Sequence, residues 1–353
     1  DLHSTSRRQR QMCIRDSVKL IPLLDTIQLI VMSDEEYFSD KWAGYISNSK
    51  LALINPAQDG SPQIYKEGLS KHPKYSDSLV FGSAVHELVL QPKEFAVVNN
   101  VDRPTAKMGA MADELYKTFL SNKGVVSDKD IIAASDKIDY YKGKMDSIKI
   151  ENVKDKCINY WWDRRDWETE HNNSGTEPIY LDPKSREKLQ LCLASVEANK
   201  EVQDLLHPKG VFEEPISMNE AALFMDVKAE HEGKETILKL KGKLDNFTID
   251  TETNEVVLND LKTTGHWLID FGDSFKKYHY NRQMAMYAWM LRSYVEKQYN
   301  IKPSSLMANM LLVCTVPDYR AGVFRVTNGE IRKGFLEFKD LLQRVAYCEL
   351  YDL

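Results

Sequence analysis

The residues most able to do chemistry lie on two successive strand-like segments. The segment "GKLDNFTID" contains Asp245, and the following segment "NEVVLNDLKTT" contains Asp260 and Lys262. Side chains alternate between the two faces of a strand, so Asp260 and Lys262 share a face. They follow the apolar run 256–258, which heads for a protein interior. A strand that carries an aspartate and a lysine inward therefore suggests a reactive site.

The turn between the two segments predicts which residues face each other. If Asp250 and Glu255 close the turn over 251–254, antiparallel pairing sets Asp245 opposite Asp260. The same register pairs Ile249 with Val256 and Phe247 with Leu258. Two opposed carboxylates repel unless a cation lies between them. The pattern therefore suggests a divalent metal.

Carboxylate oxygens, together with water and a phosphate oxygen, suit Mg²⁺ or Mn²⁺ better than zinc, which prefers Cys and His. Lys262 would point at the same phosphate, where its charge stabilises the pentavalent transition state or orients the attacking water. An ordinary solvated strand end is the alternative, because acid-x-lysine recurs at Asp182 and at Asp226 in a chain that is 28% charged. The aspartate on the paired strand separates Asp260 from these repeats.

Composition sets wide limits. The chain has 353 residues, is 42% hydrophobic and carries a formal net charge of -6, which neither supports nor excludes a nucleic-acid partner. Five scattered cysteines, without a C-x-x-C pair, favour a reducing cytoplasm. Residues 1–31 are expected to be an artefactual or disordered extension, since "RRQRQMCIRDS" resembles translated adapter sequence. Residues 32–353 then form the domain.

The rest of the chain predicts an α/β fold in which a central mixed sheet is flanked by helices. Residues 81–91 read as an amphipathic helix that Pro92 stops, and three strands follow between 221 and 264. One long helix is expected over 274–298, then two strands and a closing helix from 328. The charged stretch 104–200 predicts a helical insertion, with a loop or hairpin from 158 to 177.

These residues resemble the PD-(D/E)XK nuclease superfamily, in its phage-type branch that includes exonuclease VIII-like and lambda-exonuclease-related enzymes. The pattern of that branch is G-x-x-x-H, an Asp, then D/E-x-K, then Q-x-x-x-Y. Here it is found in order as "GSAVH" with His86, Asp245, "DLK" at 260–262 and "QMAMY" at 283–287. The resemblance covers roughly residues 32–340 and implies a restriction-endonuclease-like core.

The resemblance also implies the roles of the site residues. His86, Asp245, Asp260 and the Leu261 carbonyl would bind one or two Mg²⁺ ions, with Mn²⁺ as a substitute. Lys262 would supply positive charge, while Gln283 and Tyr287, one helical turn apart, would reach the same edge. A tyrosine that only fills the core is the alternative for Tyr287. Glu213 or Glu214 remains open as a further acidic ligand.

Basic residues near the site could contact DNA. Lys243 precedes Asp245, and Lys276, Lys277 and Arg282 interleave with aromatic residues, a mixture suited to phosphate contact and base stacking. A solvated helix face explains these residues nearly as well. The scattered cysteines argue against the iron-sulfur cluster of some relatives.

The resemblance implies a metal-dependent DNA exonuclease that resects linear double-stranded ends for recombination. It further implies a ring-shaped homo-oligomer, a single-strand annealing protein as partner, no membrane, and the bacterial host cytoplasm if the gene is phage-encoded. Two alternatives remain: a structure-specific or CRISPR-adaptation-type endonuclease of the same fold, and an inactive DNA-end-binding protein.

Overall fold

The computed structural model describes residues 18–68, 77–91, 100–171, 178–210, 214–316 and 318–353. The chain divides into two compact units. The first comprises residues 1–72, 199–316 and 321–353, and the second comprises residues 73–198 with 317–320. The expectation for residues 1–17 lies outside the described part of the chain.

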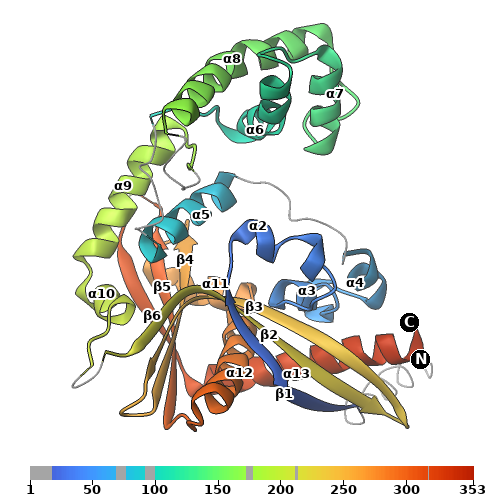
Figure 1. Ribbon diagram of the computed structural model, residues 1–353, viewed down its shortest axis with the longest axis vertical. Coiled ribbons are helices and arrows are strands. Elements are labelled where there is room, and N and C mark those ends of the chain that lie inside the picture. The colour runs from blue at the N-terminus through green and yellow to red at the C-terminus, as the bar shows by residue number, and fades with distance from the viewer. Residues whose placement is uncertain (1–17, 69–76, 92–99, 172–177, 211–213, 317) are drawn as a thin grey trace. The chain divides into compact units, whose positions relative to one another are not determined.

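A mixed six-stranded sheet forms the centre of the first unit (Figure 1). Its strands follow chain order: β1 (Lys19–Val31), β2 (Ile216–His231), β3 (Lys234–Asp250), β4 (Glu255–Thr264), β5 (Ser305–Cys314) and β6 (Ala321–Val326). Neighbouring strands are antiparallel except β4 and β5, which are parallel. A parallel pair needs a crossover connection, and helices of residues 265–304 supply it. The predicted α/β class is confirmed.

Two long helices, α12 (Tyr280–Tyr299) and α13 (Asn328–Tyr351), pack on one face of this sheet (Figure 1). Met284, Leu291 and Val295 of α12 recur at helical spacing and are buried in the main core. The two helices approach closely at Gly334, where a Cβ would lie 2.0 Å from the Asn281 carbonyl oxygen. The shorter helices of the unit are α2 (Asp34–Tyr37), α3 (Asn48–Ala52), α4 (Pro62–Gly68), α10 (Lys200–Leu206) and α11 (Phe271–Lys277).

Two expectations for this unit need correction. Residues 19–31 do not form a disordered extension: they are the edge strand β1, which pairs antiparallel with β2 and buries Ile27. The single helix expected over 274–298 is two helices, α11 and α12. They are separated at His279, whose φ of 53° lies in the left-handed region and interrupts the helix.

The second unit is helical in its described residues, while the insertion bounds 104–200 stay a prediction. Its helices are α5 (Asp77–Leu90), α6 (Ala106–Ser121), α7 (Asp128–Lys137), α8 (Ser147–Glu170) and α9 (Pro183–Ala198). Helix α8 continues to Glu170 and so replaces the first part of the loop expected over 158–177, because Tyr160 and Trp161 are buried in a separate core with Met111, Leu115 and Phe119. Residues 172–177 of that expectation lie outside the described residues. No helix in the described residues is long and apolar enough for a membrane span.

A ladder of asparagine amides crosses four strands of the sheet. Asn246 donates to Asn219 at 2.7 Å, Asn259 donates to Asn246 at 2.7 Å, and Asn309 donates to Asn259 at 3.0 Å. Asn246, Asn259 and Asn309 are at most 2% exposed. Asn259 also donates to the Leu205 carbonyl at the end of α10. Because buried amides must be hydrogen-bonded, the ladder fixes the lateral register of β2 to β5.

We expect Asn259→Leu to lower the free energy of unfolding by about 3 kcal/mol or more, because it leaves buried groups on both neighbouring strands without a partner. Asn309→Leu at the end of the ladder should cost clearly less. Urea unfolding of both variants measures the difference. An equal loss of unfolding free energy in the two variants would contradict this expectation.

Candidate active site

Strands β3 and β4 separate where the candidate site begins. The predicted pairs Ile249–Val256 and Phe247–Leu258 are present, and regular pairing continues to Asn246 and Asn259. The expected pairing of Asp245 with Asp260 is absent from the sheet. The predicted register of this hairpin is therefore wrong at its last pair. Instead the Asp245 carboxylate accepts the Leu261 amide at 2.6 Å. A side chain replaces the backbone acceptor, so the strands can diverge without leaving that amide unsatisfied.

Lys262 joins the two aspartates. Its ammonium lies 2.5 Å from Asp260 and 4.0 Å from Asp245, and it also donates to the Leu261 carbonyl at 3.2 Å. Asp260 is 1% exposed. Burial alone would lower the pKa of Lys262, but the charges of Asp260 and Asp245 outweigh it and raise the pKa above its ordinary value. Lys262 therefore carries a fixed positive charge at neutral pH.

Helix α12 brings the two predicted residues of its first turns to the same place. The Gln283 amide donates to Asp260 at 2.7 Å. Tyr287 is packed against β3 at Gly242, where a Cβ would lie 2.8 Å from the tyrosine ring. Burial raises the pKa of Tyr287 well above its ordinary value, and a hydrogen bond with Gln283 opposes part of that shift. The tyrosine thus both packs on the core and belongs to the polar cluster.

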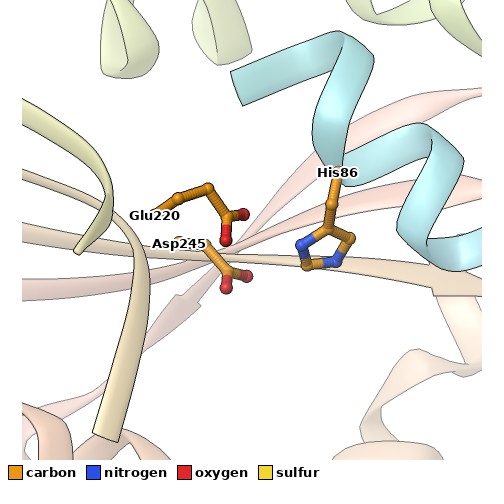
Figure 2. A group of neighbouring side chains, drawn as sticks. All are labelled: His86, Glu220 and Asp245. Carbon is orange, nitrogen blue, oxygen red and sulfur yellow. The ribbon is translucent and has the colours of Figure 1, made fainter. Parts of the chain in front are cut away.

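Glu220 on β2 is a candidate ligand that the sequence interpretation missed. Its pairing neighbours, Asn219–Asn246 and Ala221–Leu244, place it opposite Asp245. Oxygens of the two carboxylates lie within 4.8 Å of each other, and Figure 2 shows both side chains. Counting back from the turn at 232–233 would have found this pairing. Of the two acids left open instead, Glu213 lies outside the described residues and Glu214 is exposed.

The four basic residues expected to contact DNA have different surroundings. Lys276 and Lys277 are exposed in the last turn of α11 and are available to phosphate. Lys243 is 14% exposed and pairs with Asp34 and, at 2.6 Å, with Glu220. Its ammonium therefore neutralises acidic groups of the protein. The prediction for Arg282 is wrong. Its side chain is 1% exposed and binds Asn48, Gln58 and Glu337.

His86 belongs to the second unit. It is half-buried on α5, one turn after Gly82, as the "GSAVH" pattern predicts for a helical histidine.

The acids of the first unit offer a chemically consistent donor set. Glu220, Asp245 and Asp260 present carboxylate oxygens, and Leu261 presents a carbonyl oxygen that now accepts from Lys262. Hard divalent cations such as Mg²⁺ and Mn²⁺ bind oxygen ligands of this kind. The residues therefore fit a divalent metal.

Lys241 and Lys50 form a separate pair of lysines whose charges influence each other. Lys241 is 5% exposed and donates to the Tyr37 carbonyl at 2.7 Å, while Lys50 donates to the Ala43 carbonyl. Burial, with a contribution from the charge of Lys50, lowers the pKa of Lys241 to about 8. As the pH rises, the native state consequently loses the Lys241 proton at a lower pH than the unfolded chain does.

Lys241→Met should therefore change how stability depends on pH. Between pH 8 and 10 the unfolded chain binds more protons at this position than the native state, so the wild type gains stability as pH rises. The variant lacks this gain. Its advantage over the wild type, on the order of 1–3 kcal/mol at pH 7, should shrink by pH 10. Denaturant unfolding at both pH values measures it, with exposed Lys239→Met as control. A difference independent of pH would contradict the expectation.

Comparison with known proteins identifies a family for this chain. The family model of the PD-(D/E)XK nuclease superfamily matches residues 64–330. Among curated proteins, none matches the chain. A crystal structure from Eubacterium rectale, of a protein named provisionally as an exonuclease, is 13% identical with a TM-score of 0.45, and covers 92% of this chain and 88% of that one. Rai1 of Scheffersomyces stipitis, at 10% identity over 95% of this chain and 85% of its own, has a TM-score of 0.21. These scores carry no argument about activity.

Because the family model spans most of the chain, the protein belongs to the PD-(D/E)XK nuclease superfamily. This membership implies a hydrolase that acts on DNA and uses divalent metal ions. The mixed sheet with flanking helices is consistent with the restriction-endonuclease-like fold.

Proposed function

We propose that the protein is a metal-dependent DNA exonuclease that hydrolyses phosphodiester bonds from linear double-stranded ends. The observation that carries the catalytic assignment is the position of Lys262, whose ammonium reaches both Asp245 and Asp260. The preference for ends rests on the resemblance of the four motifs to phage-type exonucleases. Resection for recombination, a ring-shaped oligomer, a partner that anneals single strands and a phage origin rest on the same resemblance.

Glu220, Asp245, Asp260 and the Leu261 carbonyl would hold the metal, with His86 as a further ligand from the second unit because of its place in the "GSAVH" motif. The oxygen donors favour Mg²⁺, with Mn²⁺ as a substitute. When bound, the metal polarises the scissile phosphate and lowers the pKa of an attacking water.

The protein side chains supply orientation and charge. Lys262, kept protonated by two aspartates, would stabilise the negative charge that develops on the phosphoryl oxygens. Gln283 fixes one oxygen of Asp260, which leaves the rotation of that carboxylate restricted. Lys276 and Lys277 would contact the backbone of the substrate, a role suited to exposed lysines near the site.

Metal binding gives a test of Glu220 that does not depend on activity. Glu220→Gln should weaken binding of Mn²⁺ at least about tenfold, because a carboxylate ligand becomes a neutral amide. Glu214→Gln, an exposed glutamate near the start of the same strand, is the matched control and should bind Mn²⁺ like the wild type. Isothermal titration calorimetry measures both. Equal weakening, or none in either variant, would remove Glu220 from the ligand set.

Cleavage of end-labelled linear duplex tests the proposed activity. The wild type should release nucleotides from the ends in Mg²⁺ and leave closed circular DNA intact. Lys262→Ala should lose at least about a hundredfold in rate while still binding DNA, because a fixed charge at the transition state is removed. The exposed Lys333→Ala is the control.

Two results would count against the proposal. Cleavage of closed circles by the wild type would favour an endonuclease of the same fold. Survival of linear, branched and single-stranded DNA in both Mg²⁺ and Mn²⁺, with folded protein, would favour the binding-only alternative.

A further inference from the structure

An aromatic strip leads from the catalytic lysine to the surface of the first unit. The Lys262 ammonium lies 5.7 Å from the centre of the Tyr280 ring, and the Tyr280 ring lies 5.7 Å from the Tyr278 ring. Tyr278 is 48% exposed, and the Lys277 ammonium lies over its ring at 5.2 Å. The three groups therefore form a continuous path from the buried site to solvent.

Buried phenylalanine side chains hold the strip in place. The Phe271 ring stacks on Tyr280 at 5.9 Å, and both Phe271 and Phe275 contact Phe324 of β6. Phe271 and Phe275 are almost fully buried. The left-handed backbone of His279, which separates α11 from α12, lies between the two tyrosines. Tyr278 is thus an exposed ring on an anchored segment, which can offer a flat contact at little cost in conformational entropy.

The turn after β4 leads directly into α11 and carries exposed apolar side chains. Leu268 packs against the main core, where its methyl group lies 3.0 Å from the Cβ position of Gly322. Its neighbours Trp267 and Ile269 are 51% and 92% exposed. Trp267 follows Lys262 by only five residues, so their Cα atoms lie within about 17 Å of each other.

The charges around these exposed rings favour one kind of occupant. Lys276 and Lys277 flank the strip, and both are exposed. Aromatic rings interleaved with lysines match the alternating bases and phosphates of a single strand, whose bases stack on such rings without sequence preference. A wholly apolar partner surface would leave the two ammonium groups without a counterpart.

We propose that Tyr280, Tyr278 and Trp267, flanked by Lys276 and Lys277, bind unpaired nucleotides of the DNA strand that is engaged at Lys262. This inference rests on the proposed nuclease function and adds a preference that the function does not require. The enzyme binds a duplex end with unpaired nucleotides more tightly than a blunt end, because the extra bases stack on the strip.

The experiment measures binding separately from cleavage. All proteins carry Lys262→Ala, so that DNA remains intact, and the DNA is a duplex with either a blunt end or a short single-stranded tail containing 2-aminopurine. Fluorescence titration gives the dissociation constants, and quenching of 2-aminopurine reports stacking. The ratio of blunt to tailed dissociation constants is the decisive quantity. Tails of both polarities are used, because either strand could be the one engaged.

With an intact strip, a tail of one polarity should bind about 5- to 100-fold more tightly than the blunt end and be quenched. Adding Tyr278→Ala or Trp267→Ala should remove most of this preference and of the quenching. Tyr278→Phe should keep both, since the stacking ring remains. Tyr299→Ala is the matched control, because it lies at the other end of α12, roughly 28 Å from Tyr280.

A ratio unchanged by Tyr278→Ala and Trp267→Ala would overturn the proposal. So would a change from oligomer to monomer in light scattering, with tail binding unaffected, because the strip would then cover a protein interface. A parallel assay of the wild type on linear duplex distinguishes failure of the strip proposal from failure of the nuclease proposal. Release of nucleotides with no tail preference leaves the exonuclease function standing and rejects the strip, whereas no cleavage of any DNA rejects the nuclease function itself.

Discussion

The asparagine ladder is the constraint on which the candidate site depends. The amides of Asn246, Asn259 and Asn309 are buried, and they can be satisfied only if the neighbouring strands lie at one particular register. The acids of the site are the chain neighbours of ladder residues: Glu220 follows Asn219, Asp245 precedes Asn246, and Asp260 follows Asn259. Because successive side chains alternate, a register set by the amides also aligns the carboxylates. A slip by one residue would break both sets together.

Aligned carboxylates repel, and the structure balances them with two lysines. Lys262 lies between Asp245 and Asp260, and Lys243 pairs with Glu220. The two ammonium groups thereby neutralise part of the repulsion between the opposed carboxylates. Lys262 keeps its proton because of the same acids that would bind the metal. The ground-state electrostatics of the site would thus prepare Lys262 for the place beside the phosphate that we propose for it.

Much of this site follows from the sequence, because its elements are local. The β3–β4 hairpin closes with a short turn, so counting from Asp250 and Glu255 gives the correct pairs as far as Asn246 and Asn259. It fails at Asp245, where the carboxylate takes over from the backbone. Glu220 lies twelve residues before the turn at 232–233, so only a register carried along the whole β2–β3 hairpin sets it opposite Asp245.

Long-range contacts explain the other errors. Strand β1 pairs with residues about 200 positions away, so nothing near it in the sequence marks it as part of the sheet. The same holds for Arg282, whose charged side chain reads as a surface group. It is buried because Asn48, Gln58 and Glu337 come from elements far along the chain.

Helix α12 shows how one such contact serves the site. Glu337 of α13 binds both Arg282, at 2.9 Å, and His279, at 2.8 Å, and so fixes the start of α12 where the chain leaves α11. The next residue, Gln283, then reaches Asp260, and Tyr287, one turn on, meets β3 at Gly242. A residue that sequence assigned to DNA contact therefore acts through the fold. It sets the position of the helix from which Gln283 and Tyr287 contact the strands of the candidate site.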